Sequence, residues 1–419
     1  MYTRLYKIQY KIYIRVYKIQ CKMNTLIEKS YQKVQDVDTN FIRSIMDKID
    51  WNDRLIGIRG ARGVGKTTLL LQRIKKFLKN SNETLYVSLD NLWFVEHSLL
   101  NLVDFFVKRG GKFLFLDEVH KYPKWSQAIK NIYDDFPTLK VVFTGSSLLE
   151  ILNARTDLSR RAIVYDMQGL SFREFLNITQ KTNFQKVSLT DILESHKEIS
   201  DKILSEVKPL QFFSDYLQYG YYPFFTEGIA RFSYRLEEVA NLILEIELPL
   251  LRNIEPSYIP KIKQLLQIVA ESVPFIPNID SLSRRIAIHR NTLLSYLYYL
   301  RETRLTNHLY KDIAGINRLQ KPEKIYLENT NLAYTLAENY TEIDNIRETF
   351  FLNQLSYNHT VEYPNSGDFW VEKKFLFEIG GKSKSGKQIK DANNAYIAAD
   401  NIEYGFYKKI PLWQFGMLY

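Results

Sequence analysis

The feature that constrains this chain most is a glycine-rich loop at residues 60–68, which lies between an apolar run and a helix-like pattern. Residues 54–59 predict a buried strand, and apolar residues follow the loop at helical spacing, at Leu70, Ile74 and Phe77. Strand, glycine loop and helix in this order form a P-loop, whose backbone N–H groups surround phosphate oxygens. The predicted nucleotide-binding residues are Gly60, Ala61, Arg62, Gly63, Val64, Gly65, Lys66, Thr67 and Thr68.

Two side chains at the end of this loop have defined roles. In a P-loop the lysine reaches the β- and γ-phosphates, and the hydroxyl that follows it binds Mg²⁺. These roles fall to Lys66 and Thr67. ATP and Mg²⁺ are therefore the expected ligands.

A pair of carboxylates follows a second apolar run. Residues 113–116 predict a central strand that delivers Asp117 and Glu118 to the carboxyl edge of a parallel sheet. We predict that Asp117 holds Mg²⁺ through water and that Glu118 polarises the attacking water. His120 completes a DExH-like box, but a helicase needs a second motor domain, and no second set of sheet motifs follows residue 177. Helicase activity is therefore not expected.

A third strand is predicted at residues 140–143. With short connections, it can lie between the P-loop strand and the carboxylate strand, so that its polar end faces the γ-phosphate. Ser146 or Thr144 is then the candidate sensor of that phosphate. A serine here also fits the N-cap of a helix over 148–152, and one residue can serve both roles.

Two arginines precede the next apolar run, residues 162–165. Arg160 and Arg161 fit an arginine finger that completes the site of a neighbouring subunit, which would require a homo-oligomer. They also fit a solvated turn. We favour the finger interpretation.

Composition bounds the other classes of function. No apolar run approaches the ~18 residues that cross a bilayer, and Arg15 interrupts the apolar residues near the N-terminus. The lone Cys21 cannot form an internal disulfide or a thiolate metal cluster. For this chain of 419 residues, these observations predict a cytoplasmic protein with no membrane partner.

The positive charge is unevenly distributed. Residues 1–22 hold six basic and no acidic residues, which leaves +4 of the total +10 for the remaining chain. This repetitive stretch fits a basic tail for DNA or anionic lipid, or a non-folding extension before Met23. We favour the extension and exclude it from the predicted fold.

The middle of the chain changes pattern near residue 255. Before it, an aromatic turn at Tyr219–Phe224 is expected to pack among helices that form a lid. After it come three predicted helices, and the first two are marked by residues 262–269 and 278–287. The third contains Leu293, Leu297 and Leu300, and Asn291 is its predicted cap. A hairpin over 307–327, with Gly315 in its middle, completes a winged-helix pattern.

Basic and polar side chains gather before the third of these helices. They are Arg284, Arg285, His289, Arg290 and Asn291. At the start of a recognition helix they can contact double-stranded DNA. The alternative is a protein–protein module in which the same helix packs against the ATPase core, and Tyr296, Tyr298 and Tyr299 are compatible with such covered faces.

The C-terminal part holds two acids on or beside predicted strands. Asp368, Glu378 and Lys382 resemble the acid, acid and lysine of metal-dependent nucleases. In that pattern the lysine follows the second acid by two residues, but here Gly380 takes that place, and Gly380 with Gly381 favours the end of the strand. We therefore expect a nuclease-like fold that serves as a recognition or protein-docking surface and does not cut DNA.

Several of these segments resemble one known family. GARGVGKTT, FLFLDEVHKYPKW, FTGSS, DLSRRA and GLSFREF resemble the archaeal-type AAA+ ATPases of prokaryotes, and FEIGGKSKSGKQI and IPLWQFGMLY resemble the C-terminal domain that often follows that module. The resemblance implies a P-loop core, a helical lid, a winged helix and a C-terminal domain similar to restriction endonucleases. It implies no particular substrate.

Together these expectations define an α/β chain with a parallel sheet flanked by helices and later regions of mixed structure. The expected domains are an extension at 1–22, a P-loop ATPase core at 23–177, a lid or linker at 178–254, a winged helix at 255–330 and a nuclease-like domain at 331–419. The expected function is a Mg²⁺-dependent ATPase that couples its nucleotide state to the winged helix and to a C-terminal recognition domain, with DNA as one candidate target. The alternatives are a slow nucleotide-gated switch or scaffold and, less favoured, an ATP-dependent nuclease.

Overall fold

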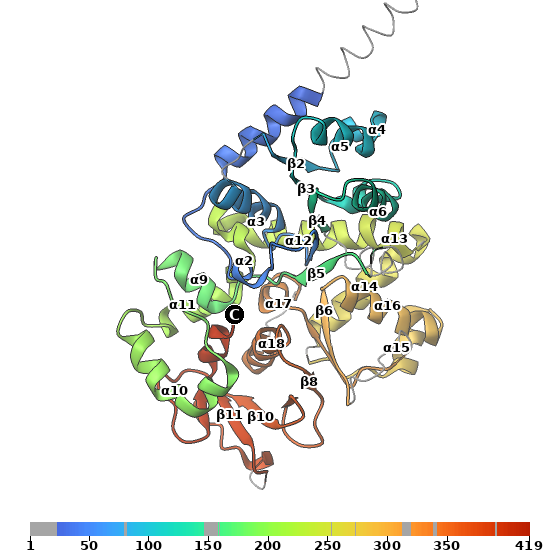
Figure 1. The fold of residues 1–419 in the computed structure, drawn as a ribbon. Helices are drawn as coiled ribbons and strands as arrows, with labels where there is room; N and C mark the ends of the chain where they lie inside the picture. Colours follow the sequence, from blue (N-terminus) through green and yellow to red (C-terminus); the bar gives the residue numbers. More distant parts are fainter. Residues whose placement is uncertain are drawn as a thin grey trace, which may run out of the picture. The chain divides into compact units, whose positions relative to one another are not determined.

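The chain divides into two compact units (Figure 1). The computed structural model describes residues 23–78, 82–145, 158, 160–252, 254–272, 274–311, 320–337, 342–389 and 392–419. The first unit contains the residues up to Gly60 and Gly65–Met167, and the second contains Ala61–Val64 and Gln168–Tyr419. The tip of the P-loop therefore groups with the second unit. The extension 1–22 lies outside the described residues.

The first unit is built on a parallel sheet of five strands with the order β2-β3-β4-β1-β5. Apolar runs form β1 to β4, whose residues are mostly buried, whereas the edge strand β5 is partly exposed. As predicted, β4 lies between the P-loop strand β1 and the carboxylate strand β3, and the α/β fold class is confirmed. The strands are β1 (Leu55–Arg59), β2 (Thr84–Ser88), β3 (Phe113–Asp117), β4 (Lys140–Gly145) and β5 (Ile163–Asp166).

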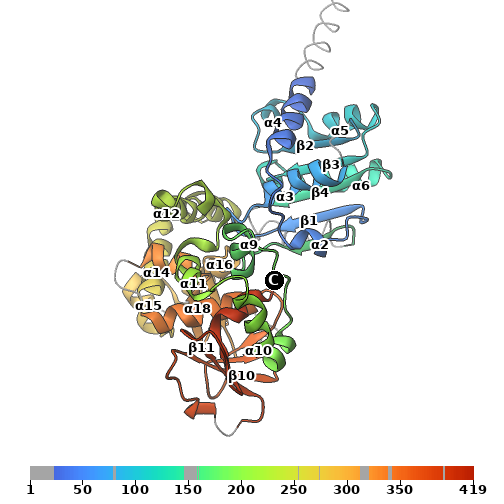
Figure 2. The same ribbon diagram turned by 90° about the vertical axis from the view of Figure 1, so that its left-hand side faces the viewer.

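Helices surround this sheet, with α5 and α6 packed against each other (Figure 2). They are a helix over 23–36, α2 (Ile45–Lys48), α3 (Lys66–Arg73), α4 (Trp93–Glu96), α5 (Leu99–Val107) and α6 (Trp125–Asp135). Leu70 and Ile74 are buried as predicted, but Phe77 is 46% exposed. The cause is a π-helical turn at Ile74–Leu78, which changes the helical spacing after α3.

The second unit begins with helices and an aromatic turn. Its first helices are α9 (Phe172–Thr179), α10 (Leu189–Leu204), α11 (Leu210–Asp215), α12 (Phe232–Leu242) and α13 (Leu248–Arg252). α11 continues as the π-helix η3 (Tyr216–Gly220), and α12 and α13 are joined by the π-helix η6 (Ile243–Glu247). Tyr221 and Tyr222 are each 2% exposed, so the aromatic turn packs into the core.

Three helices and a strand pair follow. They are α14 (Ile259–Glu271), α15 (Ile279–Ile286), α16 (Arg290–Glu302), β6 (Thr306–Leu309) and β7 (Lys324–Leu327), with β6 and β7 antiparallel. Asn278 caps α15 by accepting from the Ser281 N–H. The predicted cap at Asn291 is wrong, because the N-cap is His289, two residues earlier, and α16 begins at Arg290. Gly315 lies outside the described residues.

The C-terminal part is a mixed sheet covered by helix α18. The strand order is β12-β11-β10-β9-β8, with β10, β11 and β12 parallel and β9 antiparallel to both of its neighbours. Phe351 of α18 packs against Phe377 of β10, with ring centroids 4.9 Å apart. The elements are α17 (Thr330–Leu336), α18 (Ile343–Leu355), β8 (Val361–Glu362), β9 (Phe369–Val371), β10 (Phe375–Gly380), β11 (Ala395–Ala399) and β12 (Lys409–Pro411).

The last residue is held inside this unit. The Tyr419 carbonyl accepts hydrogen bonds from the Ser171 hydroxyl and from Arg173 Nε, at the start of α9. The C-terminus therefore lies beside α9, as both views show (Figures 1 and 2). Within the described part of the chain, no helix combines the length and apolar character needed to span a membrane.

Candidate nucleotide-binding site

The P-loop connects the end of β1 to the start of α3. Gly63 and Gly65 have φ angles of 86° and 96°, which residues with a side chain rarely adopt. At Gly60 a Cβ atom would lie 2.2 Å from the Met167 carbonyl oxygen, so that a larger residue does not fit. These three glycines give the loop the tight backbone that presents N–H groups at a helix N-terminus, which favours an anion there.

The lysine of this loop folds back over it. Lys66 is 5% exposed, and its Nζ donates to the Gly60 carbonyl at 2.9 Å. The ammonium group therefore lies at the loop, where P-loop lysines bind phosphate. Thr68, one residue after the predicted Mg²⁺ ligand, is exposed in the first turn of α3.

Asp117 lies at the centre of a cluster of hydroxyl groups. It is 2% exposed at the end of β3, and its Oδ2 accepts from Thr67 Oγ1 at 2.6 Å and from the Tyr86 hydroxyl at 2.8 Å. Its Oδ1 accepts from Thr144 Oγ1. The structure thus brings the predicted pair Thr67 and Asp117 into direct contact, which is the arrangement expected for a P-loop Mg²⁺ site.

Tyr86 is a member of this cluster that the sequence did not reveal. Burial raises the pKa of its hydroxyl, and the charge of Asp117 raises that pKa further, so the group remains a proton donor to the carboxylate. Tyr86 lies on β2, inside the apolar strand Thr84–Ser88. A phenol within an apolar run is the only signal available, and it is also typical of ordinary core packing.

Glu118 occupies a strained backbone position. Its φ is 52°, a region that costs a residue with a Cβ roughly 1–2 kcal/mol and that recurs at functional sites. Its N–H donates to Thr144 Oγ1 at 3.2 Å, and its side chain, 20% exposed, lies 3.4 Å from His120 Nε2. Asp117 is buried among the hydroxyl groups, whereas the Glu118 side chain is partly exposed and lies beside His120. The two adjacent carboxylates thus differ in burial and in hydrogen-bond partners.

Thr144, near the end of β4, contacts the Asp117 carboxylate and the Glu118 backbone. It is fully buried and bonds both Asp117 and the Glu118 N–H. Ser146, the other candidate sensor, lies outside the described residues, as does the predicted helix 148–152. Thr144 therefore connects β3 to β4 at the carboxyl edge.

The two arginines before β5 have different surroundings. Arg160 is exposed. Arg161 pairs with Asp134 of α6, with Nε 3.1 Å from Oδ1 and a second contact of 3.2 Å to Oδ2. The structure therefore engages Arg161 within its own unit and leaves Arg160 at the surface.

Arg62, at the tip of the P-loop, forms an ion pair with Glu247 in the second unit. The Arg62 guanidinium lies 3.0 Å from Glu247 Oε1, and the two side chains are 35% and 5% exposed. Next to it, Gly63 packs against Phe224, which would lie 3.0 Å from a Cβ atom there. Ala61–Val64 thus pack against other residues of the second unit, to which they belong.

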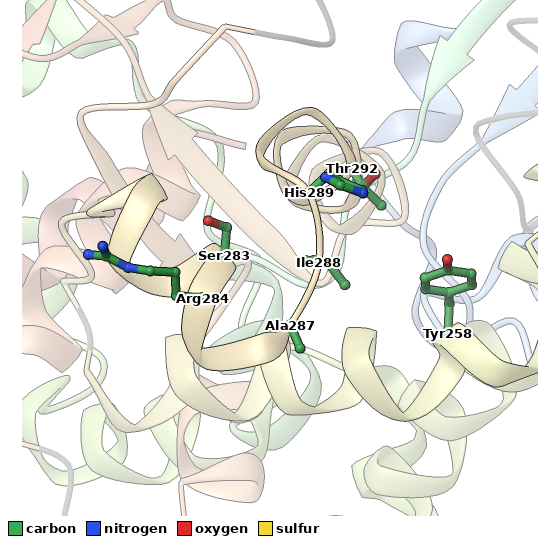
Figure 3. A pocket seen from close by; sticks show the side chains of 7 residues that line it. All are labelled: Tyr258, Ser283, Arg284, Ala287, Ile288, His289 and Thr292. Atoms are coloured by element: carbon green, nitrogen blue, oxygen red, sulfur yellow. The ribbon is translucent and has the colours of Figure 1, made fainter.

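A second candidate surface surrounds the start of α16. Tyr258, Ser283, Arg284, Ala287, Ile288, His289 and Thr292 line a pocket of about 370 Å³. Figure 3 shows the Arg284 side chain extending away from Tyr258 and His289. All five predicted DNA-contact residues are exposed, and Arg290 pairs with Asp280 at 3.4 Å.

The C-terminal acids come together, but with a different lysine from the one predicted. Asp368 Oδ2 accepts from the Ile379 N–H at 2.7 Å, beside Glu378. Lys384 Nζ lies 3.1 Å from Glu378 Oε1, whereas Lys382 is exposed. β10 ends at Gly380 as expected, and the strand alternation that would align Lys382 with Glu378 therefore stops before it.

Comparisons with known proteins place the P-loop unit in a class. Residues 52–176 match the model of a family described as an AAA domain. Together with the geometry above, this match supports an AAA+-type ATPase domain. The uncharacterized protein MJ1637 of Methanocaldococcus jannaschii is 26% identical over 317 residues, which are 72% of this chain and 66% of that protein. The chain thus spans just under two thirds of that relative.

Two solved structures align with parts of this chain at low TM-scores. The Walker-type ATPase PABY2304 of Pyrococcus abyssi is 14% identical with a TM-score of 0.39, covering 74% of this chain and 95% of its own. AMPPCP-bound DnaA from Aquifex aeolicus is 17% identical with a TM-score of 0.27, covering 61% and 84%.

Proposed function

We propose that this protein is a Mg²⁺-dependent ATPase that transmits its nucleotide state from the P-loop to a winged-helix region acting on duplex DNA. The observation that supports hydrolysis best is the arrangement at the carboxyl edge of the sheet. Lys66 lies over the loop, Thr67 contacts Asp117, and Glu118 follows Asp117 on a strained turn. Different residues are thus suited to bind phosphate, to bind the metal ion and to polarise water.

The residues fit ATP and Mg²⁺. The loop backbone and Lys66 would hold the phosphates, and Thr67, with Asp117 behind it through water, would hold the ion. When bound, Mg²⁺ neutralises phosphate charge and orients the γ-phosphate. Glu118 then orients the attacking water and takes its proton, and His120, 3.4 Å from it, stabilises the carboxylate orientation.

A chain of contacts inside the second unit supports the coupling. Arg62 pairs with Glu247, which ends η6 and leads directly into α13. Arg252, the last residue of α13, pairs with Glu302 at the end of α16, at 2.7 Å. One continuous helical segment therefore connects the P-loop tip to the proposed recognition helix, and movement of the tip would shift that helix.

Exposure and charge support DNA as the partner of the winged helix. Arg284, Arg285, His289 and Arg290 are all exposed around the start of α16. Solvated cations at the start of a recognition helix can neutralise phosphates, with a salt dependence that reports their number.

The ATPase and its coupling are tested by steady-state phosphate release with and without duplex DNA. Turnover that rises with DNA in the wild-type chain but not in Arg62→Ala or Glu247→Gln supports the coupling. Equal stimulation in all three proteins would contradict the coupling, and no phosphate release under any condition would contradict the ATPase. The matched control is Arg235→Ala, which breaks the exposed Arg235–Glu227 pair elsewhere in the second unit.

DNA contact is tested separately by binding at several salt concentrations. Arg285→Ala/Arg290→Ala should weaken binding and flatten the salt slope by about two charges, whereas deleting residues 1–22 should change neither. The opposite pattern would move the DNA site to the N-terminal tail.

A slow nucleotide-gated switch or scaffold is the second candidate. It is favoured by the bidentate contact of Arg161 with Asp134, which engages an arginine expected to stabilise the transition state. Single-turnover and steady-state rates distinguish the two functions. Fast binding followed by less than about one turnover per minute would favour the switch, because P-loop proteins that lack an arginine finger hydrolyse slowly.

A further inference from the structure

The acids of the C-terminal sheet lie side by side. The Asp368 N–H donates to the Phe377 carbonyl at 2.9 Å, and the Asp368 carboxylate accepts from the Ile379 N–H at 2.7 Å. These two bonds bracket Glu378, so Asp368 lies along the same stretch of β10.

One oxygen of Glu378 has no protein partner. The side chain is 3% exposed, and Oε1 pairs with Lys384. Oε2 is buried and accepts no hydrogen bond among the described residues. A buried carboxylate oxygen left in this way is destabilising unless a cation or donor binds it. The orphaned oxygen, next to Asp368, indicates a cation ligand.

The nuclease pattern has a lysine two residues after the second acid, where this chain has Gly380. The Lys384 side chain occupies the space beside that position. A Cβ atom on Gly380 would lie 2.7 Å from Lys384 Cδ and 3.0 Å from its Cγ. The Lys384 stem therefore fills the space in which a side chain at position 380 would begin. A turn after β10, closed by the Lys384 N–H bond to the Gly381 carbonyl at 3.0 Å, brings it back.

Further charges complete the surroundings. Glu348 of α18 accepts from the Tyr326 hydroxyl at 2.6 Å and lies 3.8 Å from Lys324 Nζ, with both charged side chains 14% exposed. In the described part of the chain, no three His, Cys, Asp or Glu side chains converge as a metal cage. Two carboxylates suffice for Mg²⁺ or Mn²⁺, because such ions usually keep several waters and bind substrate phosphate oxygens.

We propose that Asp368 and Glu378 bind one divalent cation and that, with Lys384, they form a second active site that hydrolyses phosphodiesters of nucleic acid. The oxygen of a water molecule forms a bond to phosphorus while one ester P–O bond breaks. The water loses a proton to solvent, and the leaving oxygen gains one from solvent. Lys384 stabilises the negative charge on the phosphate. The expectation of a non-cutting surface depended on a missing lysine, which Lys384 supplies.

Cation binding is tested with Mn²⁺ alone. Free Mn²⁺ is measured by electron paramagnetic resonance during titration of the full chain carrying Asp117→Asn. This substitution removes the carboxylate proposed to hold the ion at the nucleotide site. Adding Asp368→Asn/Glu378→Gln should abolish one Mn²⁺ equivalent, with circular dichroism confirming an unchanged fold. The same stoichiometry with and without the double substitution would overturn the cation site.

Hydrolysis is tested on supercoiled plasmid and single-stranded oligonucleotide with Mg²⁺ or Mn²⁺, in a Lys66→Ala background that removes the P-loop lysine. Lys384→Ala should slow cleavage by at least about 100-fold, whereas Lys387→Ala should cleave at the parental rate. The decisive variant is Gly380→Lys/Lys384→Ala, in which a lysine at position 380 enters the space that Lys384 leaves, and cleavage should return.

Three results would overturn the proposal. They are cation binding without cleavage of either substrate, cleavage that survives Asp368→Asn/Glu378→Gln, and a loss of cleavage in Lys382→Ala with none in Lys384→Ala. The last result would restore the lysine predicted from the sequence.

Discussion

Removing the Tyr86 hydroxyl isolates one of the three donors that hold Asp117. In Tyr86→Phe the ring keeps its packing on β2, but the 2.8 Å bond to Asp117 Oδ2 is lost. A hydrogen bond to a charged group contributes about 1.5–3 kcal/mol. Thr67 and Thr144 still donate to the carboxylate, so it remains bound by two hydroxyls. We expect the first unit to lose about 2 kcal/mol of stability.

The same change should weaken Mg²⁺ activation. Outer partners of a metal ligand typically change metal affinity by about 10- to 100-fold, and Asp117 keeps two of its three donors, so about 10-fold is expected. Phosphate release at saturating ATP is measured over a range of Mg²⁺ concentrations, and urea unfolding is followed in parallel. The matched control is Tyr122→Phe, whose hydroxyl accepts from the Leu99 N–H at 3.2 Å, away from the carboxylates. An unchanged Mg²⁺ midpoint in Tyr86→Phe would refute the positioning role.

Two further predictions follow from the arginines and from a buried histidine. If an arginine acts across a subunit interface, mixing Arg160→Ala/Arg161→Ala protein with Lys66→Ala protein restores part of the phosphate release. No rescue at any ratio, with a monomer in ATP by light scattering, would contradict this. Burial holds the pKa of His308 well below 6.5, with Arg301 adding to the effect, so below pH 6.5 only the unfolded chain gains this proton and stability falls as pH falls. Urea unfolding between pH 7 and 5 should therefore show a loss of stability that His308→Asn removes, and a loss that persists unchanged in this variant would contradict the assignment.

The nucleotide site was predictable where it depends on local sequence order. Gly60 to Thr67 and the pair Asp117 and Glu118 follow apolar strands directly, and parallel strands bring their carboxyl ends to one edge. The position of β4 followed from short connections. Residues near in sequence to a strand end are therefore placed by the sheet itself.

The contacts that the sequence did not reveal join positions far apart in the chain. Tyr86 and Asp117 meet because β2 and β3 are neighbours, and Arg62 meets Glu247 across 185 residues. No sequence pattern predicts contacts at these separations along the chain. Lys384 was missed for another reason, because the turn after Gly380 brings back a residue that strand alternation would not align with Glu378.

The most direct test of the ATPase compares nucleotide binding and phosphate release in three proteins. Fluorescent ATP binding and phosphate release are measured for the wild-type chain, Lys66→Ala and Glu118→Gln. We predict that Lys66→Ala loses binding, and that Glu118→Gln binds ATP as the wild type does but hydrolyses it about 100- to 10,000-fold more slowly. Hydrolysis at the parental rate in Glu118→Gln, or wild-type binding in Lys66→Ala, would contradict the proposed site.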